Sequence, residues 1–154
     1  MLTVEHIDTP MDFDALAALK TMAGSGGVII MNEDTCIVEA TARLLKFYEA
    51  ESCGQCSQCR EGSHWLARMF YRIENGKGTF EDLEQIGKIC SEMAGQTICV
   101  FSDAVTGPAL SSLQKFRSEF EQHIHQGKCP HKTELERAEF EETHYVKSTL
   151  SLNK

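Results

Sequence analysis

The stretch Cys53-Gly54-Gln55-Cys56-Ser57-Gln58-Cys59 spaces three cysteines at intervals of three residues, and a fourth, Cys99, lies forty positions after Cys59. Four thiolates are the ligand set of a cubane 4Fe–4S cluster. The three-residue spacing lets successive thiols point toward one centre, and Gly54 allows the backbone to approach that centre closely. The pattern therefore predicts one metal cluster bound by a group that we name the cysteine quartet: Cys53, Cys56, Cys59 and Cys99.

Amphipathic helices are predicted on both sides of this stretch. Apolar residues recur at helical spacing, with mostly short connections, over 35–50, 61–74, 80–94 and 107–124. Thr79, with Asp82 three residues on, begins the third helix, and Pro108 begins the fourth because proline suits the first turn of a helix. The series favours a small four-helix bundle and a mainly α fold. Helices of alternating direction bring the cysteine run and Cys99 to the same end.

The segments that flank the predicted bundle differ from it. Residues 4–7 and 28–31 are predicted as short strands around a helix over 13–22, a β-α-β unit too small to bury a core alone. The last residues are polar and rich in Lys, Glu and His, which is typical of a mobile or surface-bound tail. We therefore divide the chain into the remnant of a larger β-containing domain, the four-helix domain and a polar tail: 1–33, 34–126 and 127–154.

Composition is that of an ordinary globular protein. Of the 154 residues, 42% are hydrophobic and 25% are charged, which argues against intrinsic disorder. A formal net charge of −8 without a basic cluster argues against nucleic acid as a partner. No apolar run approaches the roughly 18 residues of a membrane span, so no direct membrane insertion is expected. Without a secretion signal at the N-terminus, the seven cysteines are expected to be free thiols or metal ligands.

Two other interpretations of the cysteine quartet stay open. Zinc also binds four thiolates, although two separated C-x2-C pairs are its usual pattern. The chain would then be a zinc-stabilised, redox-inactive protein-interaction module. In the remaining interpretation the cysteines are small core residues that bind no metal.

Further cysteines and histidines lie outside the quartet. Cys36 and Cys90 are expected to be packed thiols, with a regulatory disulfide as the alternative. Near the polar tail, the surroundings favour solvated side chains over a second metal site for four candidate ligands: His123, His125, Cys129 and His131.

Residues close to the quartet have two interpretations each. Trp65 is expected to anchor the bundle rather than relay electrons. Arg60 either balances the negative charge of a four-thiolate cluster or forms a surface ion pair. Ser52 and Ser57 either donate hydrogen bonds to cluster sulfurs or cap a helix.

Longer stretches around these residues resemble a known family. Residues 51–62, ESCGQCSQCREG, resemble the signature ESCGxCxPCREG of the flavin- and NADH-binding subunit of respiratory complex I, the F subunit of NADH-quinone oxidoreductase. Related diaphorase subunits of NAD-reducing hydrogenases and formate dehydrogenases carry the same signature. Three more stretches are similar to that family: GSGGVIIM (24–31), QTIC (96–99) and FRSEFE (116–121). The resemblance runs to about Cys129 and concerns the C-terminal part of the family subunit.

The resemblance implies electron transfer. It makes the cysteine quartet the ligands of one 4Fe–4S cluster that takes single electrons from reduced FMN and passes them toward quinone. The family binds FMN and NADH in an N-terminal domain that this chain lacks, so no substrate chemistry is implied for the chain alone. The implied partners are the thioredoxin-like 2Fe–2S subunit, the large iron–sulfur subunit of the peripheral arm, and an FMN/NADH-binding domain if it is separately encoded. The implied location is cytoplasmic, peripheral to the inner membrane through other subunits.

The sequence also departs from the family. Gln58 stands where the family has proline, which is expected to loosen the ligand loop, and the interval from Cys59 to Cys99 is about one residue shorter. Gly24–Gly27 follows a predicted helix and precedes a predicted strand, the reverse of the order that a phosphate loop needs. By resemblance, 1–33 is the C-terminal remnant of a β-grasp-like (SLBB-type) domain. The resemblance does not separate a quinone-linked complex from a hydrogenase- or formate dehydrogenase-linked one.

Overall fold

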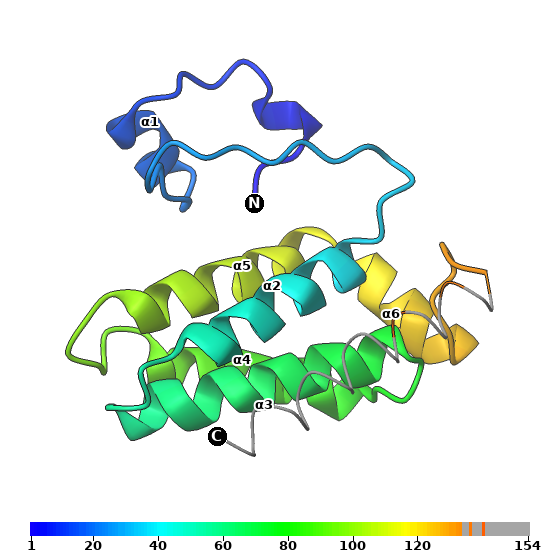
Figure 1. Cartoon of the computed structure of the whole chain (residues 1–154). Helices are drawn as coiled ribbons and strands as arrows, with labels where there is room; N and C mark the ends of the chain where they lie inside the picture. The colour runs from blue at the N-terminus through cyan, green and yellow to red at the C-terminus, as the bar shows by residue number, and fades with distance from the viewer. Residues whose placement is uncertain (134–135, 137–139, 141–154) are drawn as a thin grey trace.

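Amphipathic helices make up the body of the chain in a computed structural model, which describes residues 1–133, 136 and 140. Two short segments come first, the 3-10 turn η1 (Val4–His6) and the helix α1 (Phe13–Ala18). The longer helices that follow are α2 (Ile37–Glu51), α3 (Ser57–Glu74), α4 (Phe80–Met93), α5 (Phe101–Lys115) and α6 (Arg117–Gln126). Figure 1 shows α2 to α5 lying side by side with alternating directions. The predicted mainly α fold is confirmed.

Local capping chemistry places α4 where it was expected. The Thr79 hydroxyl accepts a hydrogen bond from the Asp82 N–H at 3.2 Å, and the Asp82 carboxylate accepts one from the Thr79 N–H at 2.8 Å. This reciprocal capping box satisfies two N–H groups that the first turn of a helix leaves without partners. The helix ends at Met93, close to its predicted limit.

Two helix boundaries differ from the prediction. α3 begins at Ser57 rather than near 61, because the Arg60 N–H already donates to the Cys56 carbonyl at 3.0 Å. α5 begins at Phe101, so Pro108 lies inside it rather than at its start. A proline inside a helix loses one hydrogen bond and crowds the carbonyl four residues earlier. The helix nevertheless continues through Pro108, with buried side chains on both sides of it. The predicted fourth helix is instead two helices, separated at Phe116, where φ is −121°.

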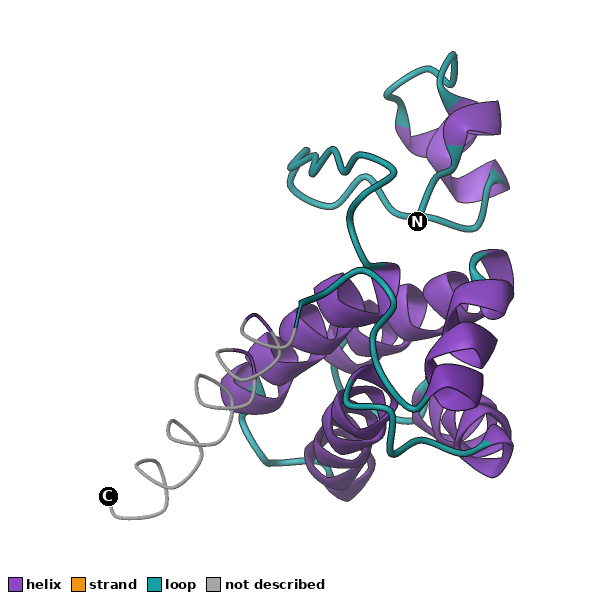
Figure 2. Cartoon of the chain, turned by 90° about the vertical axis from the view of Figure 1, so that its right-hand side faces the viewer, coloured by secondary structure: helices purple, strands orange, loops and turns teal. Residues whose placement is uncertain are grey.

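No strand forms among the described residues, so the strands predicted over 4–7 and 28–31 are wrong. Ile29 and Ile30 are 82% and 91% exposed, and Figure 2 draws their segment as an open loop above the helices. A strand requires a neighbour that pairs with its N–H and C=O groups, and no described segment supplies one. The helix predicted between them is confirmed in a shorter form, α1, with Asp12 capping it by a 2.7 Å bond from the Ala15 N–H.

The hydrophobic core lies between α2, α3, α4 and α5. Each contributes a side chain without solvent exposure: Leu45, Leu66, Ile86 and Val105. α6 adds Phe120, whose ring meets that of Phe70 edge to face at 5.4 Å. None of the described helices has the length and apolar character needed to cross a membrane.

Trp65 does not belong to this core. Its side chain is 52% exposed, so the prediction of a buried anchor is wrong. The buried stripe of α3 runs through Leu66, Phe70 and Ile73. Trp65 directly precedes Leu66 and is therefore turned about 100° away from it around the helix, which places Trp65 at the edge of the stripe.

Candidate metal centre

Three members of the cysteine quartet lie where α2 turns into α3. Cys53 is exposed in the connection, Cys56 is the half-buried N-cap of α3, and Cys59 is buried in the first turn of that helix. The hydroxyl oxygen of Ser52 lies 3.4 Å from the Cys59 sulfur. The Ser57 hydroxyl makes a different contact, because it donates a hydrogen bond to the side-chain carbonyl of Gln58 at 3.2 Å.

The turn that carries Cys53 is held by Gly54 and Arg60. Gly54 has a φ of +77°, a conformation that favours glycine. Nη1 of Arg60 donates a hydrogen bond to the Gly54 carbonyl at 2.6 Å, which ties the turn to the first turn of α3. Nε of Arg60 also pairs with the Glu61 carboxylate at 2.9 Å, with both side chains about half exposed. The surface ion pair is therefore present, and the same guanidinium lies beside the quartet.

The fourth cysteine, Cys99, is exposed just before α5. The Thr97 hydroxyl donates to the Cys99 carbonyl at 2.8 Å and lies 2.6 Å from the Ser102 hydroxyl. The Asp103 carboxylate accepts a hydrogen bond from the Gly95 N–H at 3.0 Å, which closes the turn between α4 and α5. These contacts fix the backbone around Cys99 while its sulfur stays accessible.

Both connections lie at one end of the bundle, at the left in Figure 1. Each leads into the N-terminus of a longer helix, α3 or α5, and no side chain caps either terminus. The free N–H groups and the dipole of such a terminus favour negative charge. All four cysteines of the quartet are free thiols.

Gln58, which stands where the resembled family has proline, is the second residue of α3 and is helical. A proline at that position would also be compatible with a helix, because the N–H groups of the first turn have no helical acceptor.

A second group of ligand-type side chains gathers at the opposite end of the helices. Its members are almost fully buried and their ligand atoms lie within 4.8 Å of one another; we name it the buried tetrad: Cys36, Glu74, His123 and Cys129. The Cys36 sulfur lies 3.4 Å from the Glu74 carboxylate and 3.3 Å from Nε2 of His123. His123 and Cys129 are therefore not solvated, and the expectation that they would be is wrong.

The other residues of that prediction do not join the tetrad. The His125 ring meets the Phe80 ring at 5.2 Å, and Nε2 of His131 lies 3.8 Å from the Glu119 carboxylate. Cys90 is fully buried in the apolar core, as predicted for a packed thiol, and burial raises its pKa to about 12.

Charge interactions inside the tetrad are strong. Burial alone would lower the pKa of His123, but hydrogen bonds to Cys129 and Glu74 raise that pKa to about 10. The hydrogen bond shared by the two cysteines lowers the pKa of Cys129 and raises that of Cys36. Burial raises the pKa of Glu74, and the neighbouring His123 and Lys132 outweigh it so that the carboxyl is held below its usual value. Lys132 lies 3.2 Å from the Glu74 carboxylate.

Sequence reasoning missed Glu74 and the role of Cys36. Glu74 ends α3 after an apolar stripe, and nothing local marks a glutamate there as buried. A signal did exist for Cys36, which precedes the first amphipathic helix at the position of an N-cap. Its sulfur accepts the Glu39 N–H at 3.3 Å.

Comparison with known proteins finds a family match over residues 39–123, described as the NADH-ubiquinone oxidoreductase-F iron-sulfur binding region. The matched region contains the whole cysteine quartet. Among similar proteins, the F subunit of NADH-quinone oxidoreductase from Mycobacterium bovis is 38% identical over 130 residues, 84% of this chain and 29% of that protein. The corresponding protein of Streptomyces coelicolor is 40% identical over the same coverage. That of Rickettsia bellii is 42% identical over 114 residues, 74% of this chain and 27% of that protein. The chain thus spans less than a third of the length of these relatives.

Proposed function

Because the chain belongs to the family of NADH-ubiquinone oxidoreductase-F iron-sulfur binding regions, we propose that it transfers electrons through one 4Fe–4S cluster held by the cysteine quartet. One observation carries the proposal. The two connections that contain all four thiols lie at the same end of the helices, and each opens into an uncapped helix N-terminus.

The pattern of the four cysteines favours a cluster over a single zinc ion. Three of them come from one C-x2-C-x2-C run and the fourth from a distant connection, whereas zinc sites with four thiolates usually use two separated C-x2-C pairs. In a cubane each of the four thiolates binds a different iron.

The surroundings suit the negative charge of a four-thiolate cluster. The N-terminal N–H groups of α3 and α5 point toward the end where the thiols lie. The guanidinium of Arg60 adds a positive charge at the turn that carries Cys53, where it binds the Gly54 carbonyl, and the hydroxyl of Ser52 is placed to donate to the Cys59 sulfur. When bound, the cluster supplies one-electron transfer, and hydrogen bonds of this kind raise its reduction potential.

The relatives suggest a setting for this transfer, since they are named as a component of NADH-quinone oxidoreductase. We propose that the quartet takes electrons from an FMN held by a separate NADH-binding domain and passes them toward quinone. The proposed partners are the thioredoxin-like 2Fe–2S subunit and the large iron–sulfur subunit of a membrane-peripheral arm. We also propose that residues 1–33 correspond to the C-terminal remnant of a β-grasp-like domain.

Anaerobic purification of the full chain, followed by iron and sulfide analysis, tests the proposal. We expect about four irons and four sulfides per chain and a brown colour that dithionite bleaches. Cys99→Ser should lose the cluster, whereas Cys90→Ala, a buried cysteine remote from the quartet, should keep it. A colourless protein with one zinc ion that depends on Cys99 would instead establish the redox-inactive zinc module.

A further inference from the structure

The buried tetrad joins four segments that are distant in sequence. Cys36 is the N-cap of α2, Glu74 is the last residue of α3, His123 lies in the last turn of α6, and Cys129 follows that helix. Their side chains are between 0% and 4% exposed. The site lies at the right-hand end in Figure 1, opposite the cysteine quartet.

Three of the four donor atoms already have the spacing of a tetrahedral metal site. Zn–S, Zn–N and Zn–O bonds of about 2.3, 2.0 and 2.0 Å place neighbouring ligand atoms about 3.3–3.8 Å apart, with the largest separation between two sulfurs. Nε2 of His123 lies 3.3 Å from the Cys36 sulfur and 3.2 Å from the Glu74 carboxylate oxygen. That oxygen lies 3.4 Å from the same sulfur. All four donor atoms, including the Cys129 sulfur, lie within 4.8 Å of one another, so side-chain shifts around a central ion would complete this geometry.

The histidine is oriented as a metal ligand. Its Nδ1 lies 2.8 Å from the Glu119 carbonyl oxygen, which fixes Nδ1 as the donor and directs Nε2 toward Cys36 and Glu74. Metal-binding histidines usually hold their other ring nitrogen in this way. The Glu119 carboxylate also accepts the Ile37 N–H at 2.7 Å, which fixes α6 against the start of α2.

Charge balance supports a dication. Two thiolates and a carboxylate carry three negative charges, and a divalent ion with the Lys132 ammonium carries three positive charges. Nζ of Lys132 lies 3.2 Å from the Glu74 carboxylate and 2.9 Å from that of Glu39.

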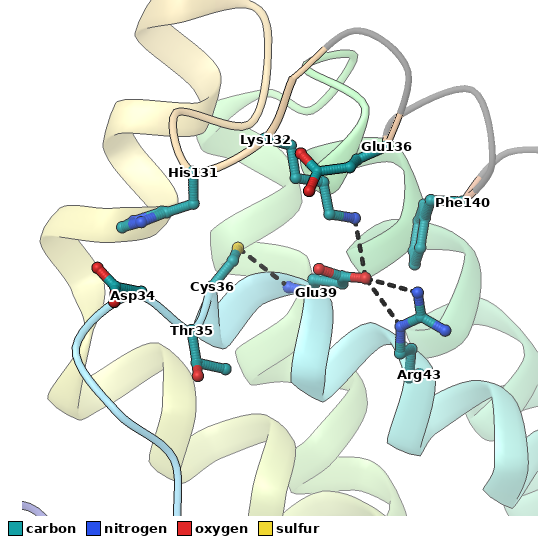
Figure 3. Close-up of a pocket in the computed structure, with 9 residues that line it drawn as sticks. All are labelled: Asp34, Thr35, Cys36, Glu39, Arg43, His131, Lys132, Glu136 and Phe140. Carbon is teal, nitrogen blue, oxygen red and sulfur yellow. Dashed lines mark hydrogen bonds and ion pairs between the residues drawn. The ribbon is translucent and has the colours of Figure 1, made fainter.

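A surface cavity of about 420 Å³ is lined by Cys36, one member of the tetrad. Figure 3 shows the Cys36 sulfur facing His131 and Lys132 across this cavity. Through Cys36, the cavity borders the tetrad.

We propose that the buried tetrad binds one Zn²⁺ ion as a structural site, separate from the cluster proposed for the quartet. Two sulfurs, one imidazole nitrogen and one carboxylate oxygen suit zinc rather than Mg²⁺ or Ca²⁺, which prefer oxygen ligands alone. Four protein ligands leave no open position, as in structural zinc sites. The ion fastens the segment that contains Cys129 onto the ends of α2, α3 and α6.

Metal analysis of the full chain, purified anaerobically and dialysed after incubation with zinc chloride, tests this proposal. We expect one tightly held zinc per chain in addition to any iron. Cys129→Ser should lose the zinc and keep the iron, Cys99→Ser should do the reverse, and Cys90→Ala should keep both. Zinc that survives in Cys129→Ser, or wild-type protein that holds none, would overturn the proposal.

X-ray absorption at the zinc edge of the wild-type chain keeps the test decisive if Cys129→Ser does not fold. The tetrad predicts two sulfur and two nitrogen or oxygen neighbours. Four sulfur neighbours would place the zinc at the quartet and refute the site, whatever the outcome for the proposed electron transfer.

Discussion

Gly76, in the turn after α3, is predicted to be the glycine least tolerant of replacement. Its φ is +66°, and a Cβ there would overlap the backbone carbonyl of Gly127 and the amide nitrogen of Lys128. Left-handed backbone costs alanine about 1–2 kcal/mol, and overpacking against backbone typically costs about 1–3 kcal/mol more. Gly76→Ala should therefore lower the free energy of unfolding by about 2–5 kcal/mol. Displacement of 127–128 should also move Cys129 and weaken zinc binding.

Gly95→Ala is the matched control. Gly95 has nearly the same φ, +67°, but a Cβ there meets no atom within 4 Å. Gly95→Ala should lower the free energy of unfolding only by the backbone strain, about 1–2 kcal/mol, and leave zinc binding unchanged. Urea unfolding followed by circular dichroism measures both variants. Equal losses for the two variants would refute the close approach of the Gly76 and Gly127 turns.

Two further predictions concern the quartet and the surface of α2. Ser52→Ala should lower the reduction potential of the cluster by about 20–60 mV, because a hydrogen bond of about 0.5–1.5 kcal/mol to the Cys59 sulfur is lost. Ser57→Ala is the control and should leave the potential unchanged. Equal shifts for the two variants in a redox titration would count against the Ser52 contact. Burial raises the pKa of Glu49, but the hydrogen bonds and charges of Lys46 and His64 together outweigh it, so the pKa lies below its usual value. Its stabilisation should be complete above pH 4.5, the reference value, and fade as the pH falls below that. Glu49→Gln should flatten this acid loss in urea unfolding, and an unchanged pH profile would show that the pairing contributes nothing.

Features set by neighbouring residues were predictable from the sequence. The capping box at Thr79 and the N-cap at Asp12 each depend on residues within three positions, and both form as expected. The alternating directions expected of helices with short connections also predicted that the cysteine run and Cys99 would lie at one end of the helices.

Features set by tertiary contacts were not predictable in this way. The exposed 28–31 segment has the apolar sequence of a buried strand, and only a partner strand decides whether it becomes one. Pro108 marks a helix start by local preference, yet burial of the surrounding stripe overrides that preference. The tetrad unites residues between 6 and 93 positions apart along the chain, and no periodicity connects Glu74 with Cys129.

Anaerobic crystallography of the full chain with anomalous data at the iron edge tests the central claim most directly. We predict one compact iron peak at the end where α2 meets α3 and α4 meets α5, within bonding distance of the sulfurs of Cys53, Cys56, Cys59 and Cys99. An iron-free map, or a peak that lies out of reach of Cys99, would contradict it.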